Sequence, residues 1–487
     1  MSASSVVRRG AVSFTLSFVA ALGVSAQSPT GRPLAIEDYY RVKTVGNPEL
    51  SPDGKWVAFT VGTRVEATND NTSEVWLVAS DGSAPARRVS ADGANAGTPG
   101  WLDDGRLRFS SGGRAFALQP ATPGEVTEGA TAGRAGATGG GRGGGGGGGR
   151  GGRGGGGGRA MPNSAGTMSA IVRDTPPPKR EPVYESEFAK RHEDRFKGVE
   201  FDWMDFQRDA APFPLANRAD PQVNPPQEIF ITPSGGAERQ LTHLGLRPAG
   251  ANWNPAGTTL AFTADSTYRN EMAYGRSDVW TVTVDGALKK LASNAAYSYA
   301  GAQYSPDGAW ILTTRSTPTD WVIAKKMDNG GPVDVVLVPA GGGREVNLTE
   351  AWDYLPSAPF WSRDGKYVYF TGGIGGTTHL FRVSASGGKV EQVTTGQRRL
   401  SGFSYDRAQT RMAYEVCTFE APSEIFASRF DGGGEVQLTH VQGDFTHEVA
   451  LSKAERLQFT SADGTPIEGF LLYPYGYRAN GGGQYPL

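Results

Sequence analysis

Few residues in this chain have the types and spacing needed for acid–base or metal chemistry. The 487 residues include one cysteine, Cys417, and five histidines: His192, His243, His379, His440 and His447. One cysteine excludes an intrachain disulfide and a cysteine-based zinc site. No two histidines have the i, i+4 spacing around an acidic residue that marks a zinc-binding helix. We therefore expect neither a metal nor a cofactor.

The composition narrows the classes of partner. The chain has 48 Lys+Arg against 50 Asp+Glu, a formal net charge of −2, which is not the balance of a polycation built for nucleic acid. Hydrophobic residues make up 38% of the chain, enough for a buried core. We expect a folded protein that does not bind nucleic acid.

The first 26 residues have the pattern of a secretory signal peptide. Arg8 and Arg9 precede the apolar stretch 11–24, and small residues at 24–26 form a cleavage site before Gln27. A retained anchor is the alternative, but this stretch is shorter than the roughly 20 apolar residues that span a bilayer. We expect export to the periplasm or the extracellular space, with no membrane span after signal removal.

One phrase recurs along the chain: an aromatic or apolar residue, a turn of the Ser-Pro-Asp-Gly type, and then alternating apolar residues. Copies of this turn lie at 51–54, 254–257, 305–308 and 362–365, with an eroded copy at 102–105. Proline sets the backbone angle of the turn, and glycine takes the position that needs a positive φ. The alternation that follows predicts a strand with one buried face.

A second phrase follows each copy of the first and ends near Leu-Thr. It fits seven segments, 74–90, 115–127, 228–242, 278–292, 334–349, 379–394 and 424–439. Two hairpins per unit make a four-stranded antiparallel sheet of about 40–50 residues, which is typical of a propeller blade. We predict an all-β fold, a seven-bladed β-propeller over 45–442, because a β-sandwich would not explain the fixed two-phrase period. Residues 27–44 form an N-terminal segment.

The third unit contains an insertion. Residues 139–158 are glycine and arginine only, so they have little to bury and much backbone entropy to lose on ordering. We expect residues 131–180 to be a disordered insertion within blade 3. Binding of single-stranded nucleic acid is the alternative, but 131–160 has no aromatic residue for stacking.

Three features resemble the prolyl oligopeptidase family of serine peptidases, most closely its acylaminoacyl-peptidase and dipeptidyl-peptidase-like members. They are Asp38-Tyr39-Tyr40 ahead of the first turn, the Pro-Asp-Gly blades, and the Ser-x-Asp-Gly-x-x-Ile-x-Gly stretch at 461–469. The resemblance covers about residues 35–487. It implies that 443–487 are the opening strands of an α/β-hydrolase lobe.

The family's catalytic motifs have no match in this sequence. The nucleophile elbow Gly-x-Ser-x-Gly is absent, so no catalytic residue is assigned. We expect a chain truncated before the Ser, Asp and His of the triad, with an incomplete hydrolase lobe and no activity alone.

In the dipeptidyl-peptidase branch of that family, a pair of glutamates from the propeller holds the substrate's amino group. The carboxylates in this sequence that come closest to such a pair are Glu185 and Glu187, followed by Asp202 and Asp205. Neither pair reproduces the motif of that branch, and a solvated charged segment is the alternative reading. These four carboxylates are the candidate substrate-binding residues.

Two functions of different classes remain open. The first is the substrate-gating propeller portion of an exported serine peptidase that cleaves short peptides, releasing aminoacyl or dipeptidyl units or acting as an oligopeptidase. The second is a non-catalytic extracytoplasmic β-propeller that serves as a binding module. The apolar stretch 467–474 favours the first, because alone it would leave an exposed, aggregation-prone edge.

Overall fold

The computed structural model describes residues 31–91, 93, 95–122, 126–128, 160–177, 184–196, 221, 224–268, 275–327 and 330–477. The chain divides into a larger unit, Ala35–Phe445, and a smaller unit formed by the segments on either side of it. The expected signal peptide and the Gly/Arg tract lie outside the described residues. The domain boundaries expected from the sequence remain predictions.

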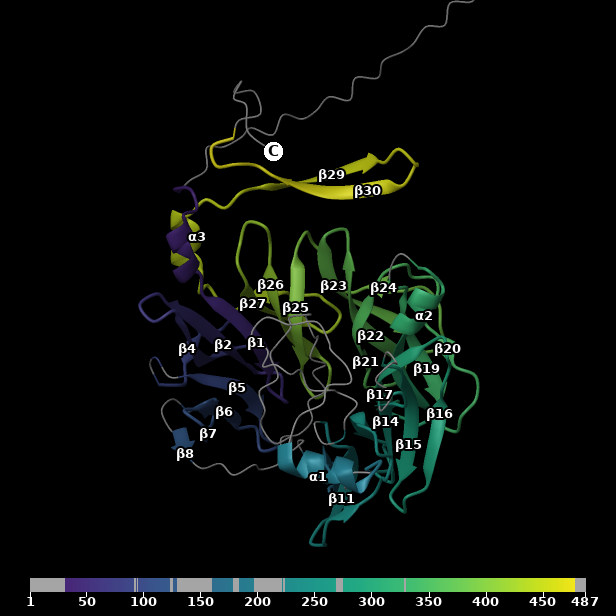
Figure 1. Ribbon diagram of the computed structural model, residues 1–487. Helices are drawn as coiled ribbons and strands as arrows, with labels where there is room; N and C mark the ends of the chain where they lie inside the picture. The colour runs from purple at the N-terminus through teal and green to yellow at the C-terminus, as the bar shows by residue number, and fades with distance from the viewer. Residues whose placement is uncertain are drawn as a thin grey trace, which may run out of the picture. The chain divides into compact units, whose positions relative to one another are not determined.

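Consecutive strands of the larger unit form antiparallel groups of four, five of them as separate sheets (Figure 1). These five are β1 Thr44–Leu50, β2 Trp56–Val65, β3 Asp70–Ala79 and β4 Arg87–Arg88; β5 Ala96–Trp101, β6 Leu107–Ser111, β7 Arg114–Leu118 and β8 Val126–Glu128; β9 Met161–Pro162, β10 Met168–Asp174, β11 Gln227–Pro233 and β12 Arg239–Gln240; β13 Ala249–Trp253, β14 Thr259–Asp265, β15 Ser277–Thr283 and β16 Leu288–Ala292; and β17 Ser298–Tyr304, β18 Trp310–Ser316, β19 Val333–Pro339 and β20 Val346–Asn347.

The last eight strands of this unit form one sheet, in which a single parallel pair, Thr378 with Arg399, joins two further groups of four. These strands are β21 Pro356–Trp361, β22 Tyr367–Ile374, β23 Thr377–Ser384 and β24 Glu391–Gln392; then β25 Arg399–Tyr405, β26 Arg411–Cys417, β27 Glu424–Arg429 and β28 Val436–Gln437. Helices are short: η1 Ile36–Tyr40, α1 Glu187–Phe196, α2 Thr319–Ala324 and α3 Gly443–Glu448. The prediction of an all-β chain is confirmed.

The Ser-Pro-Asp-Gly turns close the first hairpin of their groups through hydrogen bonds of the serine side chain. In the turn before β18, Ser305 Oγ accepts the N–H of Trp310 at 3.0 Å, and Gly308 has a φ of 74°. The Ser305 hydroxyl donates to Asp307 Oδ1 at 2.5 Å, and this bond lowers the pKa of Asp307 below its ordinary value. The recurring sequence is therefore a self-capped hairpin turn.

Part of the expected disordered insertion is ordered, which corrects the prediction for 131–180. Strands β9 and β10 lie inside this range, and Asn163 begins a turn of the same design. Asn163 Oδ1 accepts the N–H of Thr167 at 2.9 Å and that of Met168 at 3.2 Å, and Gly166 has a φ of 69°. Asparagine performs the task of serine here, as it does at 254–257, but 163–166 has neither proline nor aspartate, so the Pro-Asp pattern did not reveal this copy.

The first and last groups of strands pack against each other, with β1 beside β25, β26 and β27 (Figure 1). Their shared core includes Phe59 from the first group and Ile425 from the last, both fully buried. Ser404 Oγ also accepts the N–H of Leu50 at 2.7 Å. Among the described strands, none of the first group pairs with one of the last. This seam between β1–β4 and β25–β28 is therefore formed by packing and individual hydrogen bonds, not by a shared β-ladder.

The smaller unit contains an antiparallel hairpin, β29 Ala454–Thr460 and β30 Pro466–Leu472. Its turn repeats the capping chemistry, because the Ser461 hydroxyl bonds Asp463, whose Oδ1 accepts the N–H of Thr465 at 3.0 Å. One face carries exposed apolar side chains, among them Leu457 and Phe459. The strand pair expected from the sequence is present. No helix among the described residues has the length and apolar character needed to span a bilayer.

Candidate functional site

The acidic residue that begins the second phrase has a structural partner in the threonine that ends it. Thr242 Oγ1 accepts the N–H of Ile229 at 2.9 Å and donates to Glu228 Oε2 at 2.6 Å. The other oxygen of Glu228 accepts the N–H of Gly245 at 2.7 Å. Glu228 and Thr242 are both buried. This clamp satisfies a buried carboxylate and fixes the fourth strand of the group.

His379 occupies the place of that acidic residue in its group. Its side chain is buried, with Nδ1 3.2 Å from Thr394 Oγ1 and Nε2 2.9 Å from the carbonyl oxygen of Gly396. A carbonyl oxygen only accepts, so Nε2 carries the proton and Nδ1 accepts from the threonine. Burial lowers the pKa of His379 below its ordinary value. The histidine is a neutral structural replacement and has no free nitrogen for catalysis.

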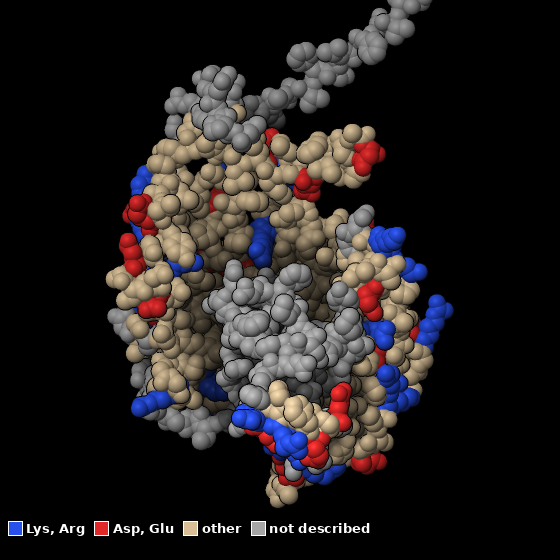
Figure 2. Space-filling model, viewed as in Figure 1, with Lys and Arg blue, Asp and Glu red and all other residues tan. Residues whose placement is uncertain are grey.

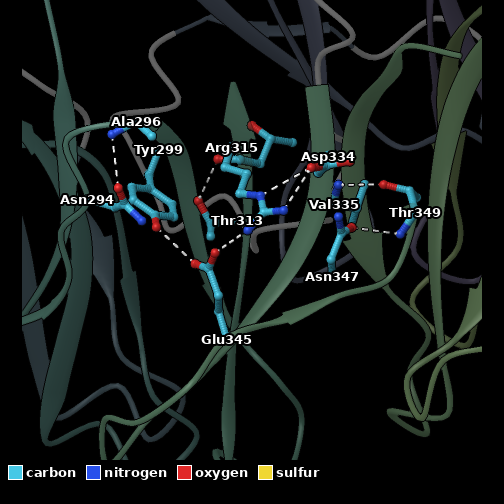
Figure 3. Close-up of polar contacts among 11 residues, drawn as sticks. Asn294, Ala296, Tyr299, Thr313, Arg315, Asp334, Val335, Glu345, Asn347 and Thr349 are labelled. Atoms are coloured by element: carbon cyan, nitrogen blue, oxygen red, sulfur yellow. Dashed lines mark hydrogen bonds and ion pairs between the residues drawn. The ribbon is translucent and has the colours of Figure 1, made fainter. Parts of the chain in front are cut away.

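A polar cluster surrounds Arg315 at one end of strands β17, β18 and β19 (Figure 3). Arg315 is paired with Asp334 across β18 and β19, and both Nε and Nη2 lie 3.1 Å from Asp334 Oδ2. Nη1 donates to Glu345, whose other oxygen accepts the Tyr299 hydroxyl at 2.9 Å. The guanidinium group also lies 4.2 Å from the ring centroid of Tyr297. Asp334, Glu345 and Tyr297, from three separate segments, thus contact the guanidinium group of Arg315.

Burial and charge together define what the Arg315 cluster can do. The side chain of Arg315 is 14% exposed, and those of Asp334 and Glu345 are 14% and 20% exposed. Burial opposes ionisation of Arg315, but the bonds from Glu345 and Asp334 outweigh it and raise its pKa. Burial, reinforced by the hydrogen bond to Glu345, raises the pKa of Tyr299. All groups are matched, so the cluster braces the sheet and offers no poised acid, base or nucleophile.

The structure does not bring Glu185 or Glu187 into this cluster. Glu185 lies in a bend, Glu187 is the first residue of α1, and both are exposed. Asp202 and Asp205 lie outside the described residues. Substrate binding by these four residues remains a prediction. Sequence reasoning missed Arg315, because its partners come from separate strands and share no linear motif.

Charged side chains of both signs lie on the face shown in Figure 2. On the face shown in Figure 2, Lys and Arg side chains alternate with Asp and Glu, and neither sign forms a continuous patch. No group of three or more His, Cys, Asp or Glu among the described residues could hold a metal ion. The described part of the chain is therefore a scaffold of packed sheets with internal polar braces.

Comparison with known proteins shows which proteins this chain is similar to in sequence. No family model matches the chain. Dipeptidyl-peptidase 5 of Porphyromonas gingivalis is 23% identical over 95% of this chain and 64% of its own length. Peptidase YuxL of Bacillus subtilis is 23% identical over 56% of this chain and 54% of its own length. The resemblance to prolyl oligopeptidase-family peptidases is confirmed.

Solved structures show the same fold. An acylaminoacyl peptidase in complex with Z-Gly-Gly-Phe-chloromethyl ketone is 14% identical and superposes with a TM-score of 0.54, covering 91% of this chain and 59% of that one. The acylaminoacyl peptidase of Pyrococcus horikoshii is 13% identical with a TM-score of 0.54, covering 90% and 58%. The chain thus spans less than two thirds of the length of these prolyl oligopeptidase-family relatives.

Proposed function

We propose that this chain is the substrate-gating propeller portion of an exported serine peptidase that cleaves short peptides. The observation that carries the proposal is the similarity to dipeptidyl-peptidase 5 over 95% of this chain. The secretory pattern of residues 1–26 supports export. Hydrolysis is a property of the whole protein in this proposal, since the sequence printed here contains no Gly-x-Ser-x-Gly.

The larger unit is a seven-bladed propeller in this proposal. Seven consecutive groups of four strands, from β1–β4 to β25–β28, support the count. The first strands of several groups carry small exposed residues near their centres, including Thr98, Gly250, Gly301 and Gly402. Small side chains leave room for an extended peptide, whereas the packed sheets around them exclude a folded protein. The ring selects substrates by size.

The hairpin of the smaller unit is the start of the hydrolase lobe in this proposal. Leu457, Phe459 and Ile467 are 37%, 56% and 37% exposed. An isolated two-stranded hairpin is marginally stable in water, and an apolar face of this kind is normally buried by a larger domain. A hydrolase core packed on this face would supply the missing stabilisation.

Two measurements on the protein purified from its native source test the proposal. A fluorophosphonate probe should label an active serine, and the intact mass should exceed that of the 487-residue chain by about 200–250 residues, the span of one further domain. The labelled protein should cleave nested peptides that share one scissile bond, with kcat/KM falling steeply as length increases. No labelling and no excess mass would refute the peptidase and favour the binding module.

A further inference from the structure

A hydroxyl group recurs at one position of the second strand in five groups. The residues are Thr60, Ser110, Thr263, Thr314 and Thr371, each paired with the residue that precedes a bulge in the first strand. Each hydroxyl donates to the carbonyl oxygen of its pairing partner, at 3.1 to 3.4 Å. The bond stays within one group of strands and holds the bulge in place.

The last group breaks this pattern with Glu415. Glu415 pairs with Ser401 before the bulge of β25, as the hydroxyl residues do in the other groups. Its Oε2 accepts the Ser401 hydroxyl at 3.1 Å, but its Oε1 accepts the N–H of Asn47 at 3.0 Å. Asn47 lies in the bulge of β1 and has a φ of 51°. Glu415 therefore ties the last group of strands to the first.

Two glycines make room for this contact. A Cβ atom added at Gly46 would lie 2.9 Å from Glu415 Oε1, and one added at Gly402 would lie 2.8 Å from it. Gly402 also has a φ of 63°, which favours glycine for a second reason. The bulges of β1 and β25 are thus both shaped around one carboxyl group.

Other hydrogen bonds also cross the seam: Arg411 Nη2 donates to the carbonyl oxygen of Ser80 at 2.7 Å, and the N–H of Arg407 donates to that of Pro52 at 3.2 Å. The bond from Leu50 N–H to Ser404 Oγ has a counterpart elsewhere in the ring, since Asn252 Oδ1 accepts the N–H of Tyr304 at 3.1 Å. What sets Glu415 apart is its position, because the hydroxyl residues at the same position in the five other groups bond to the carbonyl oxygen before the bulge of their own group. Other neighbouring groups are also connected by the continuous chain, whereas the first and last are joined only by packing and hydrogen bonds.

We propose that Glu415 is a latch on the seam of the ring, and that the latch loosens when its carboxyl group loses a proton. A protonated carboxyl group keeps both bonds, accepting from Asn47 and donating to Ser401. An ionised one also accepts both, but places a charge in a partly buried site. The latch is therefore strongest when neutral.

The surroundings of Glu415 agree with this direction. Burial raises its pKa, against the lowering effects of the Asn47 N–H, the Ser401 hydroxyl and the charge of Arg399 on β25. From β27, the residue paired with Glu415 is the apolar Ile425. A raised pKa in the closed ring means that the contribution to closure is complete below the ordinary value and is lost as pH rises through the raised value.

Hydrogen–deuterium exchange of the full chain, followed by mass spectrometry, tests the latch. Glu415→Thr installs the hydroxyl of the other groups and removes the bond to Asn47. We expect about tenfold faster exchange in residues 44–50, the effect of one lost hydrogen bond to a neutral group. Thr314→Val removes an equivalent bond far from the seam and should leave 44–50 unchanged. Unchanged exchange in Glu415→Thr, or equal acceleration in both variants, would overturn the proposal.

Glu415→Gln tests the role of the proton, because the variant can keep both hydrogen bonds but has no carboxyl group to ionise. The amide oxygen can accept from Asn47 and the amide nitrogen can donate to Ser401, so the seam should stay protected at every pH. In the native chain, protection of residues 44–50, corrected for intrinsic exchange rates, should fall as pH rises above the ordinary pKa of glutamate and through the raised pKa of Glu415. The same fall in Glu415→Gln would refute the role of the proton.

Discussion

The threonine clamp at the end of the second phrase makes a quantitative prediction in the last group of strands. Thr439 is buried, and its Oγ1 accepts the N–H of Ile425 at 2.8 Å while its hydroxyl donates to Glu424. Thr439→Val keeps the shape of the side chain, but it leaves the N–H of Ile425 without an acceptor and removes one hydrogen-bond donor to the Glu424 carboxylate. Glu424 then retains the N–H of Gln442 at 2.8 Å.

The magnitude follows from these two losses. A stranded buried N–H costs about 1–3 kcal/mol, and a lost bond to a charged group about 1.5–3 kcal/mol. We expect Thr439→Val to lower the free energy of local opening by about 3 kcal/mol, or roughly 150-fold in exchange rate. The assay is native-state hydrogen exchange of residues 424–429, which reports local opening. Global unfolding is less suitable, because a protein of several sheets need not unfold in a single two-state transition.

Two matched variants make the result decisive. Thr439→Ser keeps the hydroxyl, as Ser90 does in the first group, where it accepts the N–H of Val75 at 3.0 Å. It should cost less than about 1 kcal/mol. Thr349→Val loses only the bond to the N–H of Val335, because Asp334 is bound by an arginine instead. Equal costs for Thr439→Val, Thr439→Ser and Thr349→Val would refute the clamp.

Three further predictions follow from the other polar groups. Asp278 Oδ1 is buried without a hydrogen-bond partner among the described residues, and its group has Ala292 where the others have threonine or serine. Ala292→Thr should therefore raise the thermal midpoint. Arg315→Gln should cost about 2–4 kcal/mol in chemical denaturation, because two partly buried carboxylates lose their cation. Burial opposes the shift, but hydrogen bonding from Arg398 outweighs it and lowers the pKa of Glu435. Glu435→Gln should therefore reduce stability near neutral pH, and this difference from the native chain should vanish as pH falls through the lowered pKa.

The alternating phrases were sufficient to predict the strands, because a half-buried strand requires its period and a tight hairpin requires its turn residues. The hairpin of β29 and β30 could be predicted for the same reason, since Ser461, Asp463 and Gly464 repeat the turn chemistry of the other groups. The turn at Asn163 could not, because 163–166 has neither the proline nor the aspartate by which the other copies were recognised. Local hydrogen bonding decides such cases, not residue identity.

The sequence by itself determined the repeat, the turns and the all-β character of this protein, because these depend on interactions between residues close in the chain. Only the tertiary structure decided what surrounds Arg315 and Glu415. Arg315 meets Asp334 because β18 and β19 pair in one register. Glu415 meets Asn47, 368 positions away, because the first and last groups of strands pack against each other. Contacts of that kind depend on how whole sheets pack, and no local pattern records them.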